Sequence, residues 1–267
     1  VAAGLPAAAS WADEGLRAEV LGRFPAAEAH QGVAVDRQHV YAIGSRSIGK
    51  YDKQSGRKLA AWESDDEQPL EHLNSGFVLE GKLYCAHSNY PHQPATSSVE
   101  IWDTATLEHV GNHSFGIYEG SCTWAVFREG AWWVALAHYN DKSNPADTNN
   151  RKTSLVKFDR KWRRLAGWVF PDELMARLSP YSTSGGVWSP EGQLHITGHD
   201  APTLFVLQVP QAGSTLVPVA EIHGSTPGQG IAWDYDEGHV VYGINRKQHA
   251  VVKMRVPELS EQGAGAR

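Results

Sequence analysis

The apolar positions of the chain fall into short runs that alternate with turns rich in glycine and acidic residues. In the stretch from Glu71 to Tyr90, an apolar run at 76–79 leads into a Glu-Gly turn, and a second run at 83–86 ends at His87. Aromatic and β-branched residues favour a pleated, half-buried surface, and a short turn with glycine joins antiparallel neighbours. The pattern predicts a β-hairpin with polar groups at its open end.

The hairpin pattern recurs five times along the chain. Equivalent hairpins start at Gly32, Gly76, Trp124, Gly186 and Gly230, at intervals of 44, 48, 62 and 44 residues. A third apolar run follows each hairpin, and a fourth, more polar run follows in the first four repeats. Four strands at such a period are typical of a β-propeller blade. We therefore predict an all-β fold, a five-bladed β-propeller of four-stranded blades.

The ends of the chain extend this prediction. The fifth repeat is followed by too few residues for an outer strand, because the sequence stops at Arg267. Residues 17–24 precede the first hairpin and can supply that strand, which would close the ring and remove an exposed sheet edge. We predict one propeller domain over residues 1–267, with 17–24 as the closing strand and 258–267 as a disordered tail. Proline and acidic residues at the start of 171–178 predict a short helix there.

Composition fits one folded, soluble unit. The 267 residues are 41% hydrophobic and 20% charged, and most of the ten tryptophans fall in predicted strands, where we expect them to pack between blades. The formal net charge of −6 gives no general attraction for nucleic acid or an anionic membrane. No apolar run approaches the roughly 20 residues that a bilayer span needs. We predict a small-molecule substrate and neither nucleic acid nor membrane as partner.

The sequence leaves open the cellular location of the protein and the redox state of its two cysteines. The small apolar residues at 1–10 suit either the remainder of a processed signal peptide or a flexible start, so a periplasmic or secreted location is one alternative. Cys85 and Cys122 fall in neighbouring blades. Two buried thiols are the favoured interpretation, with a disulfide as the alternative.

Histidines follow the second strand in three consecutive repeats. These are His87, His138 and His199, and the loops at this end of a blade open on one face around the central channel. Imidazole is a common ligand of zinc and iron, and three protein ligands with an open position are typical of a catalytic metal. We predict a divalent metal ion, zinc, iron or manganese rather than calcium. The alternative is a set of separate histidines in a wet channel. The histidines expected to be structural are His39, His109, His113, His195, His223, His239 and His249.

A proton carrier is expected beside this metal. Glu119 lies where the third blade enters the channel mouth, and tyrosines at 90, 118, 139 and 181 are expected to desolvate its carboxylate and raise its pKa. His30 and His72 hold similar places in blades one and two, and we predict them as catalytic residues too. A structural role, in which Glu119 caps a loop backbone, is the alternative. The predicted substrate-binding residues are Gln31, Asn74, Tyr90, Tyr139, Gln229 and Asn245.

Several segments resemble known propellers. They are Glu28–Asp36, His72–Gly76, Cys85–Tyr90, Gly198–Asp200 and Gly228–Asp234. They resemble bacterial β-propeller proteins often labelled cycloisomerases and, more distantly, the gluconolactonase and lactonizing-enzyme propellers. The second resemblance implies a channel metal held chiefly by Glu, Asn and Asp, for which only Glu28, Asn74 and Asn245 match. Histidines hold the other places, so calcium is not carried over.

These observations lead to one functional hypothesis and two alternatives. We expect a metal-dependent enzyme that acts on a small oxygen-rich substrate, such as a lactone, sugar acid or unsaturated acid, by cycloisomerisation or lyase chemistry at the channel mouth. The sequence has no Gly-x-Ser-x-Gly, P-loop, dinucleotide fingerprint or Cys-x-x-Cys, which disfavours acyl-enzyme and nucleotide chemistry. The alternatives are a lactone hydrolase and a non-catalytic glycan- or protein-binding propeller.

Overall fold

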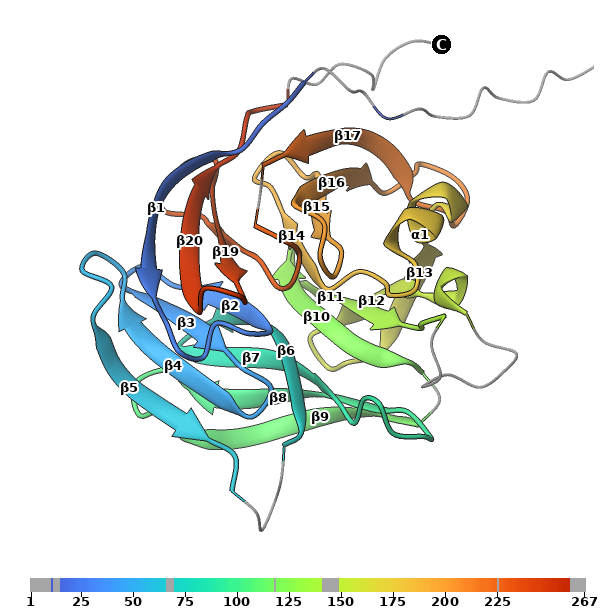
Figure 1. Cartoon of the computed structure of the whole chain (residues 1–267). Helices are drawn as coiled ribbons and strands as arrows, with labels where there is room; N and C mark the ends of the chain where they lie inside the picture. The colour runs from blue at the N-terminus through green and yellow to red at the C-terminus, as the bar shows by residue number, and fades with distance from the viewer. Residues whose placement is uncertain are drawn as a thin grey trace, which may run out of the picture.

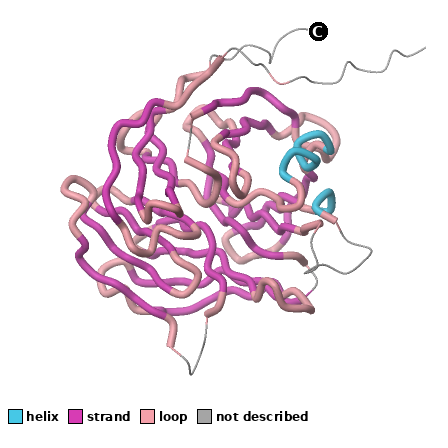
Figure 2. The backbone as a smooth tube through the Cα atoms, viewed as in Figure 1, coloured by secondary structure: helices cyan, strands magenta, loops and turns pink. Residues whose placement is uncertain are grey.

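The apolar runs form five four-stranded antiparallel sheets arranged in a ring (Figures 1 and 2). The structure is a computed structural model that describes residues 11, 15–65, 70–117, 119–140, 149–224 and 226–259. The first strands of neighbouring sheets contact one another around the ring, so each sheet is a blade that runs outward from a common axis. The predicted five-bladed β-propeller is confirmed.

The strands of each blade follow one another in the sequence. Blade one contains β2 (Gly32–Val35), β3 (His39–Ile43), β4 (Ser47–Asp52) and β5 (Lys58–Glu63). Blade two contains β6 (His72–Leu79), β7 (Lys82–Ser88), β8 (Thr96–Asp103) and β9 (His109–Ile117). Blade three contains β10 (Ser121–Arg128), β11 (Ala131–Ala137), β12 (Ser154–Asp159) and β13 (Arg164–Val169). Blade four contains β14 (Gly185–Trp188), β15 (Leu194–Thr197), β16 (Thr203–Gln208) and β17 (Val217–His223).

Blade five is built from both ends of the described chain. It contains β18 (Ala232–Asp234), β19 (Val240–Asn245), β20 (Ala250–Arg255) and β1 (Glu19–Pro25). Strand β1 pairs antiparallel with β20, and Pro25 lies opposite Ala250 (Figure 1). The closing strand therefore spans 19–25 where the sequence suggested 17–24. Of the predicted tail, residues 260–267 lie outside the described part.

Two details differ from or refine the sequence prediction. Strand β6 begins at His72, four residues before the expected start at Gly76, because a register shift between Leu73 and Gly76 lets the strand continue. The predicted helix is α1 (Asp172–Leu178), which connects blades three and four, and a 3-10 turn η1 (Asn150–Lys152) precedes β12. Among the described residues, neither helix has the length and apolarity that a membrane span requires.

The inner strands approach one another to backbone contact. A Cβ atom added at Gly230 would lie 2.7 Å from Gly32 Cα, and one added at Gly32 would lie 2.9 Å from Ser75 Cα. One added at Gly185 would lie 2.9 Å from Gly230 Cα. Glycine is needed at these positions because any side chain would force the strands apart. The starts of β2, β6, β14 and the segment before β18 are thereby held together.

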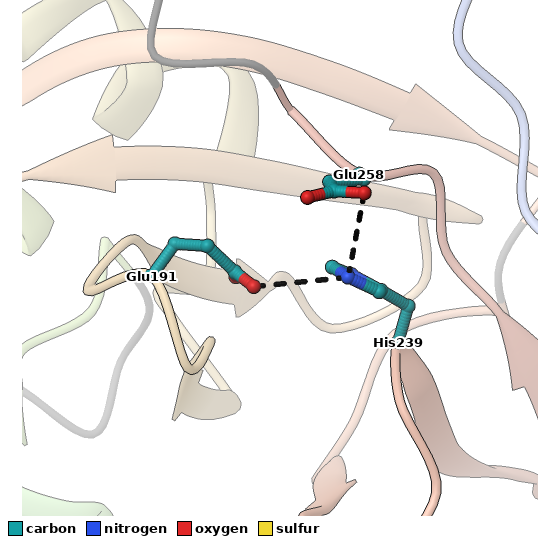
Figure 3. Close-up of side chains that lie close together, drawn as sticks. All are labelled: Glu191, His239 and Glu258. Carbon is teal, nitrogen blue, oxygen red and sulfur yellow. Dashed lines mark ion pairs between the residues drawn. The ribbon is translucent and has the colours of Figure 1, made fainter.

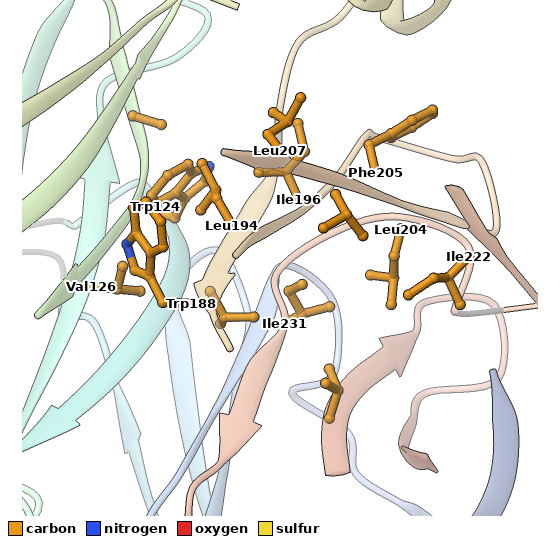
Figure 4. Packing of buried hydrophobic residues seen from close by; sticks show 14 of the residues in the cluster. Trp124, Val126, Trp188, Leu194, Ile196, Leu204, Phe205, Leu207, Ile222 and Ile231 are labelled. Atoms are coloured by element: carbon orange, nitrogen blue, oxygen red, sulfur yellow. The ribbon is translucent and has the colours of Figure 1, made fainter. Parts of the chain in front are cut away.

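Large apolar side chains fill the space between blades. Trp124 of β10 and Trp188 of β14 are 0% and 2% exposed and pack with leucines and isoleucines of blade four (Figure 4). Trp102 of blade two is equally buried. These positions confirm the structural role predicted for most tryptophans. Cys85 and Cys122 are buried and free, which confirms the interpretation as two thiols, and burial raises the pKa of both.

A pair of glycine substitutions tests the inter-blade packing. A Cβ atom at Gly186 would lie 2.5 Å from the Trp124 ring, whereas Gly111 on the outer strand β9 has no atom within 4 Å of such a position. We expect Gly186→Ala to lower the free energy of unfolding by about 1–3 kcal/mol through overpacking. Gly111→Ala is expected to change it by less than about 1 kcal/mol. Urea unfolding followed by tryptophan fluorescence measures both, and equal losses would contradict this packing.

Candidate functional site

Polar groups from four blades gather at the channel mouth, defined here by His30, His72, His87, His199 and Arg246. Each comes from an end of an inner or second strand, or from the turn beside it. Burial is the largest cause that lowers the pKa of His72, and the charges of the other four residues lower it further, to about 4. His72 is therefore a neutral imidazole at pH 7, in electrostatic contact with the other members of the mouth.

A chain of hydrogen bonds runs from His87 through blade two. His87 Nδ1 lies 3.0 Å from Ser98 Oγ, and the Ser98 hydroxyl donates to Glu100 Oε1 at 2.5 Å. Glu100 Oε2 lies 2.8 Å from His109 Nε2. These residues stand on β7, β8 and β9, so the chain crosses the blade from the mouth toward the outer strand. The Glu100 side chain is 5% exposed, and its carboxylate is satisfied from both sides.

The hydrogen-bond donors in this series of residues fix the tautomer of His87. The Ser98 hydroxyl proton is used on Glu100, so the Ser98 oxygen can only accept a hydrogen bond from His87 Nδ1–H. His87 Nε2 then carries a lone pair and no proton. This atom is buried and has no hydrogen-bond partner among the described residues. A buried polar atom without a partner is costly, and a catalytic role is one of the explanations for such an atom.

Burial is also the main cause that lowers the pKa of His87, while the charges of Glu100 and Glu71 act in the opposite direction. The ring is thus neutral near pH 7. When the ring is protonated, the Glu100 carboxylate stabilises its positive charge. An oriented imidazole with a free lone pair and a carboxylate behind it is the arrangement of a general base.

A cavity of about 380 Å³ opens beside the mouth at blades one, four and five. Its lining residues are His30, His199, Asp200, Pro227, Arg246 and Lys247. His199 Nδ1 lies 2.6 Å from Asp200 Oδ2, which leaves His199 Nε2 to accept from Arg246 Nη1 at 3.2 Å. The His199 ring stacks on Tyr181 with centroids 4.0 Å apart. This fixed ring holds the Arg246 guanidinium at the cavity.

Aromatic rings form one side of the mouth. The Tyr90 ring lies 5.3 Å from the His72 ring and 5.1 Å from the Tyr139 ring, measured between centroids. Both tyrosines were predicted to bind substrate; the structure places Tyr90 beside His72 and Tyr139 beside Tyr90. Tyr118, which was expected to desolvate Glu119, lies outside the described residues.

The predicted amide residues hold the scaffold of the mouth. Gln31 donates to Ser45 Oγ at 2.9 Å, and Gln229 donates to the backbone oxygen of His199 at 2.8 Å. Asn74 donates to the backbone oxygen of Cys122 at 3.2 Å, which links blades two and three. Asn245 accepts from the Gln248 amide within the β19–β20 turn. These bonds position the loops that carry the histidines.

Glu119 and His138 lie together at blade three. Glu119 Oε2 lies 2.6 Å from Arg164 Nη2 of the outer strand β13, and the Glu119 side chain is 37% exposed. Burial lowers the pKa of His138, as does Lys152, while Glu119 opposes them. The charges that lower the pKa of His72 include those of His30, His87 and His199. Glu119, by contrast, forms an ion pair with Arg164.

The ligand atoms of His87, His138 and His199 do not all lie within 4.8 Å of one another. Within the described part of the chain, the one group of three potential ligands that meets this distance is Glu191, His239 and Glu258. His199 also has both ring nitrogens engaged, one of them by a guanidinium, whose charge opposes a cation at that atom. The three predicted ligands are therefore not gathered at one point in this arrangement, and a metal at the mouth stays a prediction.

Sequence reasoning missed the residues that complete the site. Arg246 follows Asn245, the residue assigned to the exit position of blade five, so the repeat alignment pointed within one residue of it. Ser98 and Glu100 alternate along β8, and the period of two places them on one face of the strand. His109 was interpreted as structural, and its bond to Glu100 depends on pairing between strands, which no local pattern reveals.

Comparison with known proteins supports the fold alone. No family model matches the chain, and no curated protein matches its sequence. Among solved structures, the glutaminyl cyclase of Myxococcus xanthus is 11% identical with a TM-score of 0.58, covering 91% of this chain and 99% of that one. A luciferin-regenerating enzyme is 11% identical with a TM-score of 0.54, covering 92% and 96%. The PQQ-bound aldose sugar dehydrogenase of Streptomyces coelicolor is 13% identical with a TM-score of 0.53, covering 93% and 83%.

These neighbours are β-propellers, which confirms the propeller part of the resemblance in the sequence. The cycloisomerase label has no support from a sequence family. At such low identity the neighbours say nothing about the side chains of the mouth, and function must be argued from the site itself.

The titration of His72 tests the electrostatics of the mouth. We expect its ring to titrate at a pH of about 4, followed by NMR of the ring carbon signals and assigned with His72→Gln. Because the folded pKa lies below the unfolded value, the contribution of His72 to stability is complete above pH 6.5 and is lost as pH falls toward 4.

Removing the neighbouring cation in Arg246→Gln should raise the His72 midpoint, since Arg246 lowers it. Arg163→Gln is the matched control, because Arg163 pairs with Asp159 at the β12–β13 turn. A His72 midpoint near 6.5 in the wild type, or one that Arg246→Gln leaves in place, would contradict the description of the mouth.

Proposed function

We propose that this protein is an enzyme that moves a proton on a small carboxylate-bearing molecule bound at the channel mouth. The observation that carries the proposal is His87 Nε2, a buried lone pair without a partner, on a ring held in the proton-accepting tautomer by Ser98 and Glu100. A binding surface has no need of a carboxylate placed behind an imidazole in this way.

Arg246 supplies the recognition of the substrate. Its guanidinium is held by a neutral ring nitrogen of His199, so its charge is not neutralised by that contact. Asp200 is the one acid among the described lining residues of the cavity, and it is bound to His199 Nδ1. A guanidinium with free donors binds a planar carboxylate in bidentate fashion. The cavity, at about 380 Å³, suits a small molecule.

The groups then define a reaction. His87 Nε2 is buried and does not line the cavity, so the reaction requires the mouth to open around this atom when substrate binds. His87 Nε2 then removes a proton from the carbon next to the substrate carboxylate, and the C–H electron pair moves toward the carboxylate as an enolate-like charge. Arg246 stabilises that charge, while Glu100, through Ser98, stabilises the imidazolium of His87. The neutral N–H of His72 donates to a substrate oxygen. With a β,γ-unsaturated acid, return of the proton to the γ-carbon of the resulting dienolate shifts the double bond and gives an isomerisation. With a leaving group on the β-carbon, its departure with the bonding electrons leaves a carbon–carbon double bond and gives an elimination.

This proposal keeps the reaction class expected from the sequence, isomerase or lyase, but assigns the catalytic roles to different residues. His87 becomes the base, and Glu119, paired with Arg164, is not used. The steps are written for these side chains alone. Some propeller neighbours carry enzyme names, such as the glutaminyl cyclase, so the fold is compatible with catalysis. They do not identify the substrate.

Proton exchange in heavy water tests the proposal without knowledge of the complete reaction. Small lactones, sugar acids and unsaturated acids are incubated with the tag-free protein in deuterated buffer, and loss of C–H signals beside the carboxylate is followed by proton NMR. We expect exchange with the wild type and a loss of about 10²–10⁴-fold in His87→Gln, the effect of removing a general base. His92→Gln is the control, since His92 is 68% exposed on a loop of the same blade.

The alternatives give different results in the same experiment. Hydrolysis of a lactone without exchange indicates a lactone hydrolase, and binding without either indicates a glycan- or protein-binding propeller. Exchange that His87→Gln retains would refute the role of His87.

The pH profile tests the carboxylate behind His87. Because the pKa of His87 is lowered, the base form persists below pH 6.5, and the exchange rate is expected to fall only as pH drops through that lowered pKa. Glu100 raises the pKa of His87, so Glu100→Gln should move the acid limb to still lower pH while lowering the maximal rate. Ser98→Ala should lower the rate and leave the charge of Glu100 in place. An acid limb that is identical in wild type and Glu100→Gln would exclude this positioning role.

A further inference from the structure

A second group of ionisable side chains lies at the opposite end of the strands from the channel mouth. Glu191 belongs to the β14–β15 turn, His239 to the β18–β19 turn, and Glu258 to the segment after β20. One ligand atom from each lies within 4.8 Å of the other two. Figure 3 shows the imidazole of His239 between the two carboxylates. Three segments from two blades therefore converge on one point.

The spacing of these atoms leaves room for an ion. His239 Nε2 lies 3.7 Å from Glu191 Oε1 and 4.0 Å from Glu258 Oε2, both beyond hydrogen-bond distance (Figure 3). A tetrahedral ion with bonds of 2.0–2.2 Å would set its ligand atoms roughly 3.4 Å apart. Contraction by a few tenths of an ångström would bring the His239 nitrogen and the two oxygens to that spacing.

Contacts outside the group hold the ligands in place. Gly192, with a φ of +89°, allows the tight turn that carries Glu191, and the Ser189 hydroxyl hydrogen-bonds the Glu191 carboxylate. The amide of Val256 donates to the backbone oxygen of His239 at 2.9 Å. That bond, with burial of Val256, fixes the segment that bears Glu258. Hydrogen bonds to ligating carboxylates are the usual support of a metal site.

The charge and exposure of the group also suit a cation. Two carboxylates bring negative charge to the group, and the side chains are 31%, 26% and 71% exposed for Glu191, His239 and Glu258. An ion can therefore reach them from solvent. Arg128 lies against the same turn at Gly192, but its guanidinium pairs with Glu129 at 2.7 Å.

We propose that Glu191, His239 and Glu258 bind a divalent transition-metal ion, of which zinc is the best probe. Nitrogen and carboxylate oxygen in a set of three match zinc or manganese better than magnesium, which prefers oxygen and retains water. The ion ties the segment after β20 to the turns of blades four and five. This site is separate from the channel mouth and independent of the proposed reaction there.

Zinc titration of the tag-free protein by calorimetry tests the proposal. We expect one equivalent of zinc to bind, with an affinity that falls at least tenfold in His239→Asn and in Glu258→Gln. Asparagine tolerates the positive φ of 56° at position 239, and its shorter side chain does not reach the ion. His249→Asn is the matched control, since His249 also lies in a turn of blade five with a positive φ, 47°.

Thermal unfolding gives a second readout. Saturating zinc should raise the melting temperature of the wild type and of His249→Asn, and leave that of His239→Asn unchanged. His87→Asn separates this site from the mouth, and it is expected to bind zinc as the wild type does. The proposal is overturned if zinc does not bind, if His239→Asn and Glu258→Gln bind it with wild-type affinity, or if His87→Asn alone abolishes binding.

Discussion

Backbone contact between the inner strands is the constraint on which the rest of the propeller depends. Gly32, Gly185 and Gly230 have no side chains, so neighbouring strands meet at the separation of their own main-chain atoms. Gln31 and Gln229 stand one residue before two of these glycines and hydrogen-bond the loops of the mouth. The rigid inner ring therefore restricts the movement of the histidines and of Arg246. A site built on such contacts can hold a proton acceptor to within the tolerance that catalysis requires.

In blade two, a series of hydrogen-bonded polar side chains is accommodated inside the sheet. An isolated carboxylate at the burial of Glu100 would be strongly destabilising, but each of its oxygens has a donor, from Ser98 on one side and His109 on the other. Trp102 packs against His109 with ring centroids 5.0 Å apart and shields the chain from water. Apolar residues at the same positions would fill the blade without needing hydrogen bonds, so the polar set is better explained by its effect on His87 than by its contribution to stability.

The repeat of short apolar runs was sufficient to predict the blades, the closing strand and helix α1, because these depend on hydrophobic period and turn residues that act locally. The same alignment placed His72, His87 and His199 near the channel. Two features of the structure could not be predicted from this repeat pattern. The free nitrogen of His87 depends on which way Ser98 donates, and that follows from pairing across three strands. The group at Glu191, His239 and Glu258 joins residues from three separate segments, so no spacing along the sequence marks it.

The pairing of β1 with β20 has a consequence for the order of synthesis. Residues 19–25 leave the ribosome well before their partner, 250–255, has been made. Until blade five has been made, strand β1 has no sheet to join, and the inner strands of blades one and four lack the blade that separates them. Each new blade in that interval exposes an unpaired edge, a surface on which nascent chains associate. Once 250–255 has been made, β1 covers the outer edge of β20, and the ring of blades can close.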